Sequence, residues 1–228
     1  MKYQAVIFDM GGTLIRGSSW SEVVDDIHAM VKVLGAPEEE FVRLCMDESN
    51  GLNTGAFPSF LAFVRFVCTK LKLNVSDDNM ARAADIPFNH TKRIVMIPRA
   101  GAMEVLSSLK SAGYKIGLIS DCDPDLPMIW PETPFAPFFD SKIFSFCAGM
   151  TKADPKIFLL AVNELGVKPS DCLYIADGMR NELANATAIG MHAVQIFIPE
   201  EIDESPNREE WHGDTISSLK EILPLLGE

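Results

Sequence analysis

The feature that most restricts the fold of this chain is an alternation of helical patterns and short apolar runs in its C-terminal half. The helical pattern "AMEVLSSLKSAG" (102–113) ends at a glycine, and the apolar run "YKIGLIS" (114–120) follows it directly. The same order recurs twice more, in 155–166 with 172–177 and in 182–190 with 192–198. Alternation at this rhythm predicts a parallel sheet whose strands are joined by crossover helices.

Both ends of the chain extend this pattern. Tyr3 to Phe8 is an apolar run apart from Gln4, and Asp9 and two glycines close it. Such a continuous run is typical of a strand that is buried on both faces of a parallel sheet. A last helix is expected in "ISSLKEILPLL" (216–226). The sequence therefore predicts an α/β fold.

A segment of different character separates the first strand from the rest of the predicted sheet. From about Ser18 to Ala84 the apolar residues recur at helical spacing, so this segment is expected to be mostly helical. The stretch "IPFNHTKRIVMIPRAG" (86–101) contains two prolines and is expected to be a mixed connector. Four phenylalanines at intervals of three residues are expected to pack inside the helical segment: Phe57, Phe60, Phe63 and Phe66.

The charge balance restricts the partners of the protein. Its formal net charge is -12 and its isoelectric point is about 4.8. Nucleic acids and anionic membrane surfaces are bound through basic surfaces, so neither is expected as a partner. An anionic substrate must then be held by local groups. The acidic stretch "PEEIDESPNREE" (199–210) is expected to be a solvated loop.

Compartment and metal chemistry are also restricted by the sequence. No apolar run approaches the ~20 residues of a membrane span, and the N-terminus lacks the pattern of a secretion signal, so a cytoplasmic protein is expected.

The five cysteines include no CxxC pair, which indicates neither a disulfide framework nor a zinc site. The four histidines are scattered, and we expect them to have core or surface roles: His28, His90, His192 and His212.

Several charged or hydroxyl side chains fall where the predicted strands end. Asp9 follows the first strand, Ser120 and Asp121 follow "GLI", and Asp177 ends "CLYIAD". Lys152 stands just before a predicted helix, in "GMTKADPKIF". Parallel sheets bind ligands outside the carboxyl ends of their strands, so these groups are expected to form one site.

The chemistry of these groups indicates a metal and a phosphate. Asp9 and Asp177, with Glu182 nearby, suit Mg²⁺, which takes one or two protein carboxylates together with waters and phosphate oxygens. A lysine and a hydroxyl beside that metal suit a dianionic phosphate group.

Four short motifs contain these residues in a characteristic order. They are "FDMGGTL" with Asp9, "GLISD" with Ser120, "TKADP" with Lys152, and "IADGMRNE" with Asp177 and Glu182. With this order, the chain resembles the haloacid dehalogenase (HAD) superfamily of hydrolases along its whole length. The resemblance implies a Rossmann-like core at residues 1–17 and 96–228, and an inserted helical cap of the C1 type at residues 18–95.

The resemblance also implies a role for each site residue. Asp9 is expected to be the nucleophile, which forms an aspartyl-phosphate, and Lys152 to offset the negative charge of Asp9 and the phosphate. Asp121 stands where many relatives carry asparagine. The residues expected to contact substrate are Thr13, Ser120, Asp121 and Lys152. The residues expected to hold Mg²⁺ are Asp9, Gly11 through its carbonyl, Asp177, and Glu182 through the waters of the metal.

Gly11 is a departure from the family pattern. Most phosphatases of the family carry a second aspartate two residues after the nucleophile, which protonates the leaving oxygen and then activates water. A glycine cannot transfer a proton, so a contribution of about 10²–10⁴ in rate is missing unless another group supplies it. The backbone carbonyl remains available to the metal. We therefore expect a Mg²⁺-dependent phosphatase of a small phosphorylated metabolite or an acyl phosphate.

Three alternatives remain open at the level of sequence. Dehalogenases of the family also lack the acid, but they work without metal, and the retained Asp177 and Glu182 speak against this alternative. Phosphonatases use a cap lysine, and none of the cap lysines has a context that marks it as reactive: Lys32, Lys70, Lys72 and Lys92. The third alternative is a binding module of the same fold without catalysis, which would not need Asp9, Lys152 and Asp177 together.

Overall fold

The computed structural model describes residues 2–201 and 208–227. Within these residues the strands form one parallel sheet in the order β3-β2-β1-β4-β5-β6. The strands are β1 (Ala5–Phe8), β2 (Lys115–Ser120), β3 (Ser141–Phe144), β4 (Cys172–Ala176), β5 (His192–Ile196) and β6 (Thr215–Ile216). The predicted α/β fold is confirmed.

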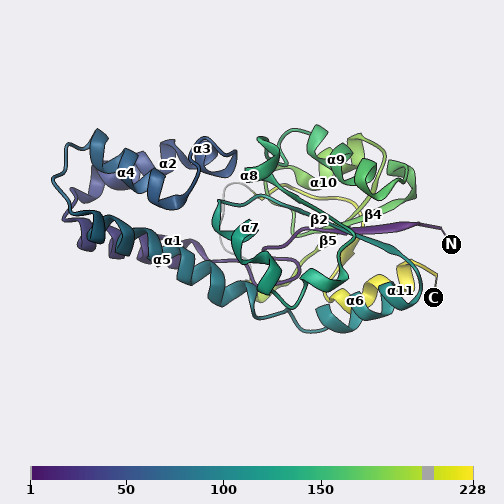
Figure 1. The fold of residues 1–228 in the computed structure, drawn as a ribbon. Coiled ribbons are helices and arrows are strands. Elements are labelled where there is room, and N and C mark those ends of the chain that lie inside the picture. Colours follow the sequence, from purple (N-terminus) through teal and green to yellow (C-terminus); the bar gives the residue numbers. More distant parts are fainter. Residues whose placement is uncertain (1, 202–207, 228) are drawn as a thin grey trace.

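Helices cover both faces of the sheet, so the core has three layers (Figure 1). One face carries α6 (Ala102–Ser111) and α11 (Ile222–Leu225), and the other carries α9 (Lys156–Leu165) and α10 (Glu182–Ala188). Strand β1 lies at the centre, and all four of its residues are buried. Alternate β1 residues point to opposite faces, which explains its continuous apolar run.

A helical unit, residues 20–95, extends from one side of this core (Figure 1). It consists of α1 (Trp20–Leu34), α2 (Glu38–Asp47), α3 (Ser49–Asn53), α4 (Phe60–Lys70) and α5 (Asp77–Val95). Serine side chains cap the N-termini of α1, α4 and α5: Ser19, Ser59 and Ser76. The unit has its own hydrophobic cluster, in which Phe63 is buried and Phe57, Phe60 and Phe66 are partly buried. The four phenylalanines therefore pack as predicted.

The structure corrects the predicted connector at 86–101. Helix α5 continues through Pro87 and ends only at Val95, so the first half of this stretch is helical. Proline removes one backbone hydrogen bond from a helix. Packing of α5 against α1 and α4 holds the helix together across that position. The second proline, Pro98, lies beyond the helix end.

Two further elements differ from the sequence predictions. Strand β3 is absent from the sequence predictions, because "SKIF" is only four residues long and includes a serine and a lysine. The prediction of a helix at 216–226 is also wrong for the first half of that range. Thr215 and Ile216 instead form β6 at the edge of the sheet, and α11 begins only at Ile222.

The acidic stretch 199–210 lies partly outside the described residues, at 202–207. Its described end is not a free loop. The Arg208 side chain bonds to Asp177, and the Glu209 carboxylate accepts the backbone N–H groups of Leu183 and Ala184 at the start of α10. The prediction of a solvated loop is wrong for these two residues.

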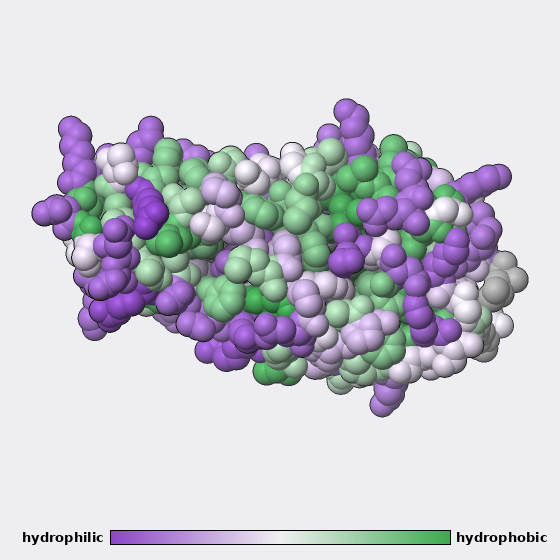
Figure 2. All heavy atoms as spheres, viewed as in Figure 1, coloured by the Kyte–Doolittle hydropathy of each residue, from purple (hydrophilic) through white to green (hydrophobic). Residues whose placement is uncertain are grey.

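The visible surface mixes residue types. In Figure 2 hydrophilic residues project from both ends of the molecule, and hydrophobic residues are distributed among them over the same face. No helix within the described ranges is long and apolar enough to span a membrane.

Candidate active site

The carboxyl edge of the sheet brings the predicted strand-end residues together. Strand β1 pairs with β2 on one side and with β4 on the other, and Phe8 lies opposite both Leu118 and Ile175. The residues that follow these strands therefore emerge side by side. They are Asp9 after β1, Ser120 and Asp121 at the end of β2, and Asp177 after β4.

Lys152 lies at the centre of this group. Its Nζ atom is 2.5 Å from Asp9 Oδ1 and 2.5 Å from Glu182 Oε2, and its side chain is only 5% exposed. Its backbone N–H donates to Asp121 Oδ1 over 2.8 Å. Asp121 also forms an ion pair with Arg180, with 3.8 Å between Nη1 and Oδ2. Asp121 thus positions the loop that carries Lys152.

Glu182 is the first residue of α10 and is fully buried, so it is not a surface glutamate. Both of its carboxylate oxygens bind protein donors. Oε2 accepts Lys152 Nζ and the Tyr174 hydroxyl, the latter over 2.6 Å. Oε1 accepts the backbone N–H groups of Gly178 and Met179. The structure therefore gives Glu182 a direct part in holding Lys152, which the sequence analysis did not anticipate.

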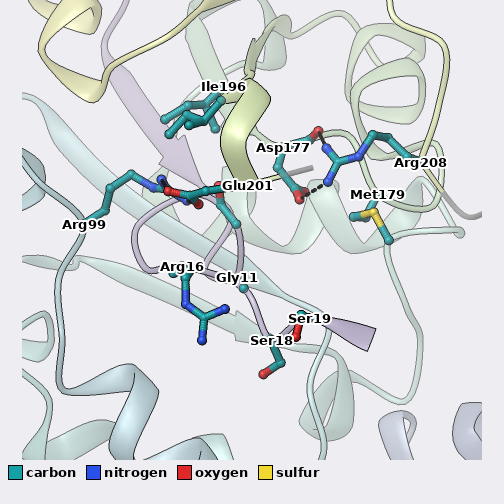
Figure 3. A pocket seen from close by; sticks show the side chains of 13 residues that line it. Gly11, Arg16, Ser18, Ser19, Arg99, Asp177, Met179, Ile196, Glu201 and Arg208 are labelled. Carbon is teal, nitrogen blue, oxygen red and sulfur yellow. Dashed lines mark hydrogen bonds and ion pairs between the residues drawn. The ribbon is translucent and has the colours of Figure 1, made fainter. Parts of the chain in front are cut away.

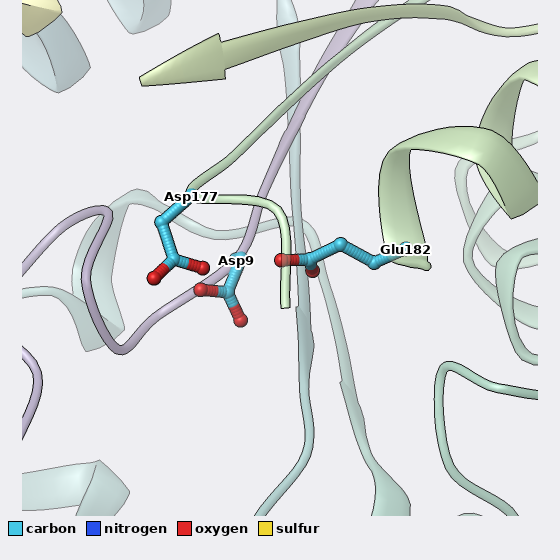
Figure 4. A group of neighbouring side chains, drawn as sticks. All are labelled: Asp9, Asp177 and Glu182. Carbon is cyan, nitrogen blue, oxygen red and sulfur yellow. The ribbon is translucent and has the colours of Figure 1, made fainter. Parts of the chain in front are cut away.

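Three acidic side chains converge around the single lysine. Oxygens of Asp9, Asp177 and Glu182 all lie within 4.8 Å of one another. Figure 4 shows their carboxylates pointing toward a common centre, with Asp9 between the other two. Asp177 Oδ1 is buried and has no hydrogen-bond partner among the described residues. A buried oxygen without a hydrogen-bond donor lowers the stability of the fold, and such an oxygen is a suitable ligand for a hard cation such as Mg²⁺.

The charges of this cluster are strongly coupled. Burial raises the pKa of Asp9 to about 7, although the Lys152 charge acts in the opposite direction. Burial, and then the charges of Glu182 and Asp9, raise the pKa of Asp177 to about 8. Burial also acts against ionised Glu182, but the Lys152 charge and the hydrogen bonds from Lys152, Tyr174 and Met179 together outweigh it and hold the pKa of Glu182 below its usual range. The cluster therefore has an excess of acidic groups over bases, which a divalent cation would neutralise.

The loop after β1 contains two glycines with different surroundings. Gly12 has a positive φ of 74°, and a Cβ there would overlap the Asp177 carboxylate. Glycine is therefore required at this position. Gly11 has no positive φ, and a Cβ there would meet no atom within 4 Å. Thr13 is buried next to them, and its hydroxyl donates to Asp9 Oδ2 over 3.1 Å.

Two arginines that the sequence analysis did not select also hold the site. Arg99 donates to the backbone carbonyls of Gly12 and Thr13 and pairs with Glu201. Arg208 donates to the Asp177 carbonyl over 2.7 Å and lies 3.3 Å from its carboxylate. Neither arginine stands in one of the four motifs, so only the three-dimensional structure identifies them.

A pocket of about 370 Å³ opens beside these groups, and we call it the loop pocket (Figure 3). Its walls include Gly11, Gly12, Ser18, Asp177 and Arg208. A second pocket of about 270 Å³, the helical pocket, lies among α1, α4 and α5 and is also lined by Asp123 from the loop after β2. Ser18 lines both pockets.

Comparisons with known proteins identify one family and several similar enzymes. A sequence model of the haloacid dehalogenase-like hydrolases matches residues 3–189. The glyceraldehyde 3-phosphate phosphatase of Methanopyrus kandleri is 25% identical over 235 residues, which cover 99% of this chain and 97% of that protein. The protein of the same name from Pyrococcus furiosus is 23% identical over 99% of this chain and 93% of its own.

A solved structure shares the fold. An enzyme of the same family from Bacteroides thetaiotaomicron, crystallised in complex with magnesium and inorganic phosphate, has a TM-score of 0.64 to this chain. The two proteins are 16% identical, and the match covers 89% of this chain and 98% of that one.

Proposed function

Because this chain belongs to the haloacid dehalogenase-like hydrolases, we propose that it is a Mg²⁺-dependent phosphatase of a small phosphorylated metabolite. Asp9 attacks the phosphorus atom, and the bond to the leaving oxygen breaks. The aspartyl-phosphate that forms on Asp9 is then hydrolysed by water. Lys152 offsets the charge that collects on Asp9 and the phosphoryl oxygens, and Ser120 and Thr13 orient them.

The observation that carries this proposal is the contact between Asp9 and Lys152 inside an acidic cluster. A carboxylate that attacks an anionic phosphate is repelled by it, and Lys152 Nζ, 2.5 Å from Asp9 Oδ1, would offset this repulsion. Asp9, Asp177 and the Gly11 carbonyl would hold Mg²⁺, and Glu182 would act on it through water. When bound, the metal supplies positive charge to the phosphate oxygens. The partnerless Oδ1 of Asp177 supports this assignment.

The relatives suggest a substrate of three carbons. Two archaeal relatives that align with nearly the whole chain are named glyceraldehyde 3-phosphate phosphatases. We therefore propose glyceraldehyde 3-phosphate as the first compound to test. We also propose that residues 18–95 act as a cap, because the helical pocket within them is also lined by Asp123 of the core. A cavity of about 270 Å³ suits a small molecule.

The test is a panel of phosphorylated metabolites that includes glyceraldehyde 3-phosphate and acetyl phosphate. Initial rates are measured with Mg²⁺ and with EDTA. We expect at least one three-carbon phosphate to reach a kcat/KM of about 10⁴ M⁻¹s⁻¹ or more with Mg²⁺. With EDTA the rate is expected to fall to background and to return when Mg²⁺ is added. Phosphatase activity that persists in EDTA, or hydrolysis of a 2-haloacid in EDTA, would contradict the proposal.

A further inference from the structure

A buried histidine connects the helical unit with the loop that carries Gly11. His90 of α5 is 8% exposed, and its Nδ1 atom lies 2.8 Å from Asp26 Oδ2 on α1. Its other ring nitrogen, Nε2, lies 3.0 Å from the Ser18 hydroxyl. One chain of contacts thus runs from Asp26 through His90 to Ser18, and it joins α5 to α1 and to the loop directly before α1. In this chain a carboxylate orients an imidazole, and the imidazole faces a hydroxyl.

Ser18, at one end of this chain, lines the same pocket as Gly11, the position of the missing acid. The loop before α1 packs on the two glycines, because a Cβ on Gly17 would lie 3.2 Å from the Gly12 nitrogen. Ser18 and Gly11 both line the loop pocket, on the same side of it (Figure 3). The space where a side chain at position 11 would extend is open. His90 and Ser18 also both line the helical pocket.

We propose that the Ser18 hydroxyl, supplied with a proton by His90, protonates the leaving oxygen in place of a carboxyl group at position 11. Ser18 is then a catalytic residue, and His90 and Asp26 are positioning residues that act through it. This proposal rests on the phosphatase function proposed above. It answers how a chain with glycine at position 11 would still protonate an alkoxide.

The protons balance over the two steps. In the first step the bond from phosphorus to the leaving oxygen breaks as Asp9 attacks. The leaving oxygen takes the Ser18 proton, and Ser18 takes the Nε2 proton of a protonated His90. In the second step water attacks the aspartyl-phosphate and gives one proton to Ser18, which returns one to His90. The net reaction converts a phosphate monoester and water into an alcohol and inorganic phosphate.

The experiment compares two leaving groups that differ in their need for a proton. Glycerol 3-phosphate leaves as an alkoxide, whereas p-nitrophenyl phosphate leaves as a stable anion. In His90→Gln we expect kcat for glycerol 3-phosphate to fall about 10²-fold with little change in KM, and kcat for p-nitrophenyl phosphate to fall less than about threefold. Ser18→Ala should change the ratio of the two rates similarly, and the double variant should add little.

A second measurement introduces an acid at position 11. If His90 had only a structural role, this acid would not restore the rate that His90→Gln loses. Gly11→Asp in the His90→Gln background is expected to raise the glycerol 3-phosphate rate by about tenfold or more. In the parent the same substitution should change the ratio of rates less than about threefold, because Ser18 already provides the proton. His28→Gln is the matched control, since His28 lies on α1 of the same unit and pairs with Glu38 at the surface.

An unchanged ratio of rates in folded His90→Gln and Ser18→Ala would overturn the proposal. If His90→Gln does not fold, Ser18→Ala decides alone, because Ser18 stands in a loop and is only partly buried. The failure of the phosphatase function itself looks different. In that case the parent protein hydrolyses none of the phosphorylated metabolites of the panel and neither of these two phosphates with Mg²⁺ present, and both proposals fall together.

Discussion

The sheet edge and the helical unit both bury polar, ionisable side chains, but they fix them in different ways. At the sheet edge, Glu182 receives two backbone N–H groups, a lysine and a tyrosine. In the helical unit, His90 is held by two side chains, Asp26 of α1 and Ser18 of the loop directly before α1. Gly178 and Met179 stand in the loop directly after β4, so the sheet fixes their N–H groups, whereas side-chain partners can be exchanged. The largest effect of a single substitution is therefore expected at the sheet edge.

The largest effect is expected at Asp9. Asp9→Asn keeps the shape of the side chain but replaces a carboxylate with a poor nucleophile, so kcat should fall more than about 10³-fold. The fold should remain, because Lys152 keeps its contact with Glu182. Steady-state rates and a thermal melt check both expectations. A variant that retains a tenth of the parent activity, in a preparation free of other phosphatases, would refute the role of Asp9.

The second prediction compares the stability effects of substituting the two neighbouring glycines. Gly12→Ala should lower the free energy of unfolding by about 2 kcal/mol or more, because it combines a positive φ with overlap of Asp177. Gly11→Ala is the matched control and should change it by less than about 0.5 kcal/mol. Urea denaturation of the two variants measures both values. Equal losses at the two positions would contradict the described geometry of this loop.

A smaller effect is expected at Tyr174. Tyr174→Phe removes the 2.6 Å hydrogen bond to Glu182 and leaves a buried carboxylate with one donor fewer. We expect a loss of about 1.5 kcal/mol in the free energy of unfolding and about a tenfold lower kcat, because Lys152 is held less firmly. Tyr3→Phe, before the start of β1 and away from the carboxyl edge, is the control. If Tyr174→Phe kept full activity, the support of Lys152 by Glu182 would not matter for turnover.

The smallest effect is expected where the helical unit joins the core. Hydrogen bonds from Arg16, and then from the Ser19 backbone, lower the pKa of Glu22 to about 2. A lowered pKa in the folded state means that the ionised form stabilises the fold above the unfolded pKa. This contribution is present at pH 7 and is lost as the pH falls from 4.5 to about 2.

Glu22→Gln tests this contribution. We expect it to lower the free energy of unfolding by about 1 kcal/mol at pH 7, since the pair with Arg16 is partly exposed to solvent. The difference from the parent should shrink at pH 3.5. A difference that stays constant between the two pH values would mean that packing, and not charge, accounts for the effect.

The same contrast explains how much could be predicted from the sequence. The site residues at the sheet edge stand directly after apolar runs, and the parallel sheet brings the ends of β1, β2 and β4 together. Local patterns therefore indicated Asp9, Ser120 and Asp177. The Asp177 partner Arg208 lies 31 residues away in an acidic stretch, and no local pattern marks it.

The helical unit was less predictable for a related reason. The helical spacing of apolar residues indicates its helices. Pro87, however, favours a connector from residue 86 onward, whereas α5 continues to Val95. The contact of His90 with Asp26 and Ser18 depends on how α1 and α5 pack against each other. Sequence periodicity gives the buried face of each helix, but it does not give the register between two helices.

The most direct test of the account is detection of the aspartyl-phosphate on Asp9. The protein is mixed with acetyl phosphate and Mg²⁺, quenched within milliseconds, treated with hydroxylamine and analysed by peptide mass spectrometry. The account predicts a hydroxamate at Asp9 that is absent from the EDTA control and from Asp9→Asn. Turnover of acetyl phosphate with no modified Asp9, or with the label on another carboxylate, would contradict it.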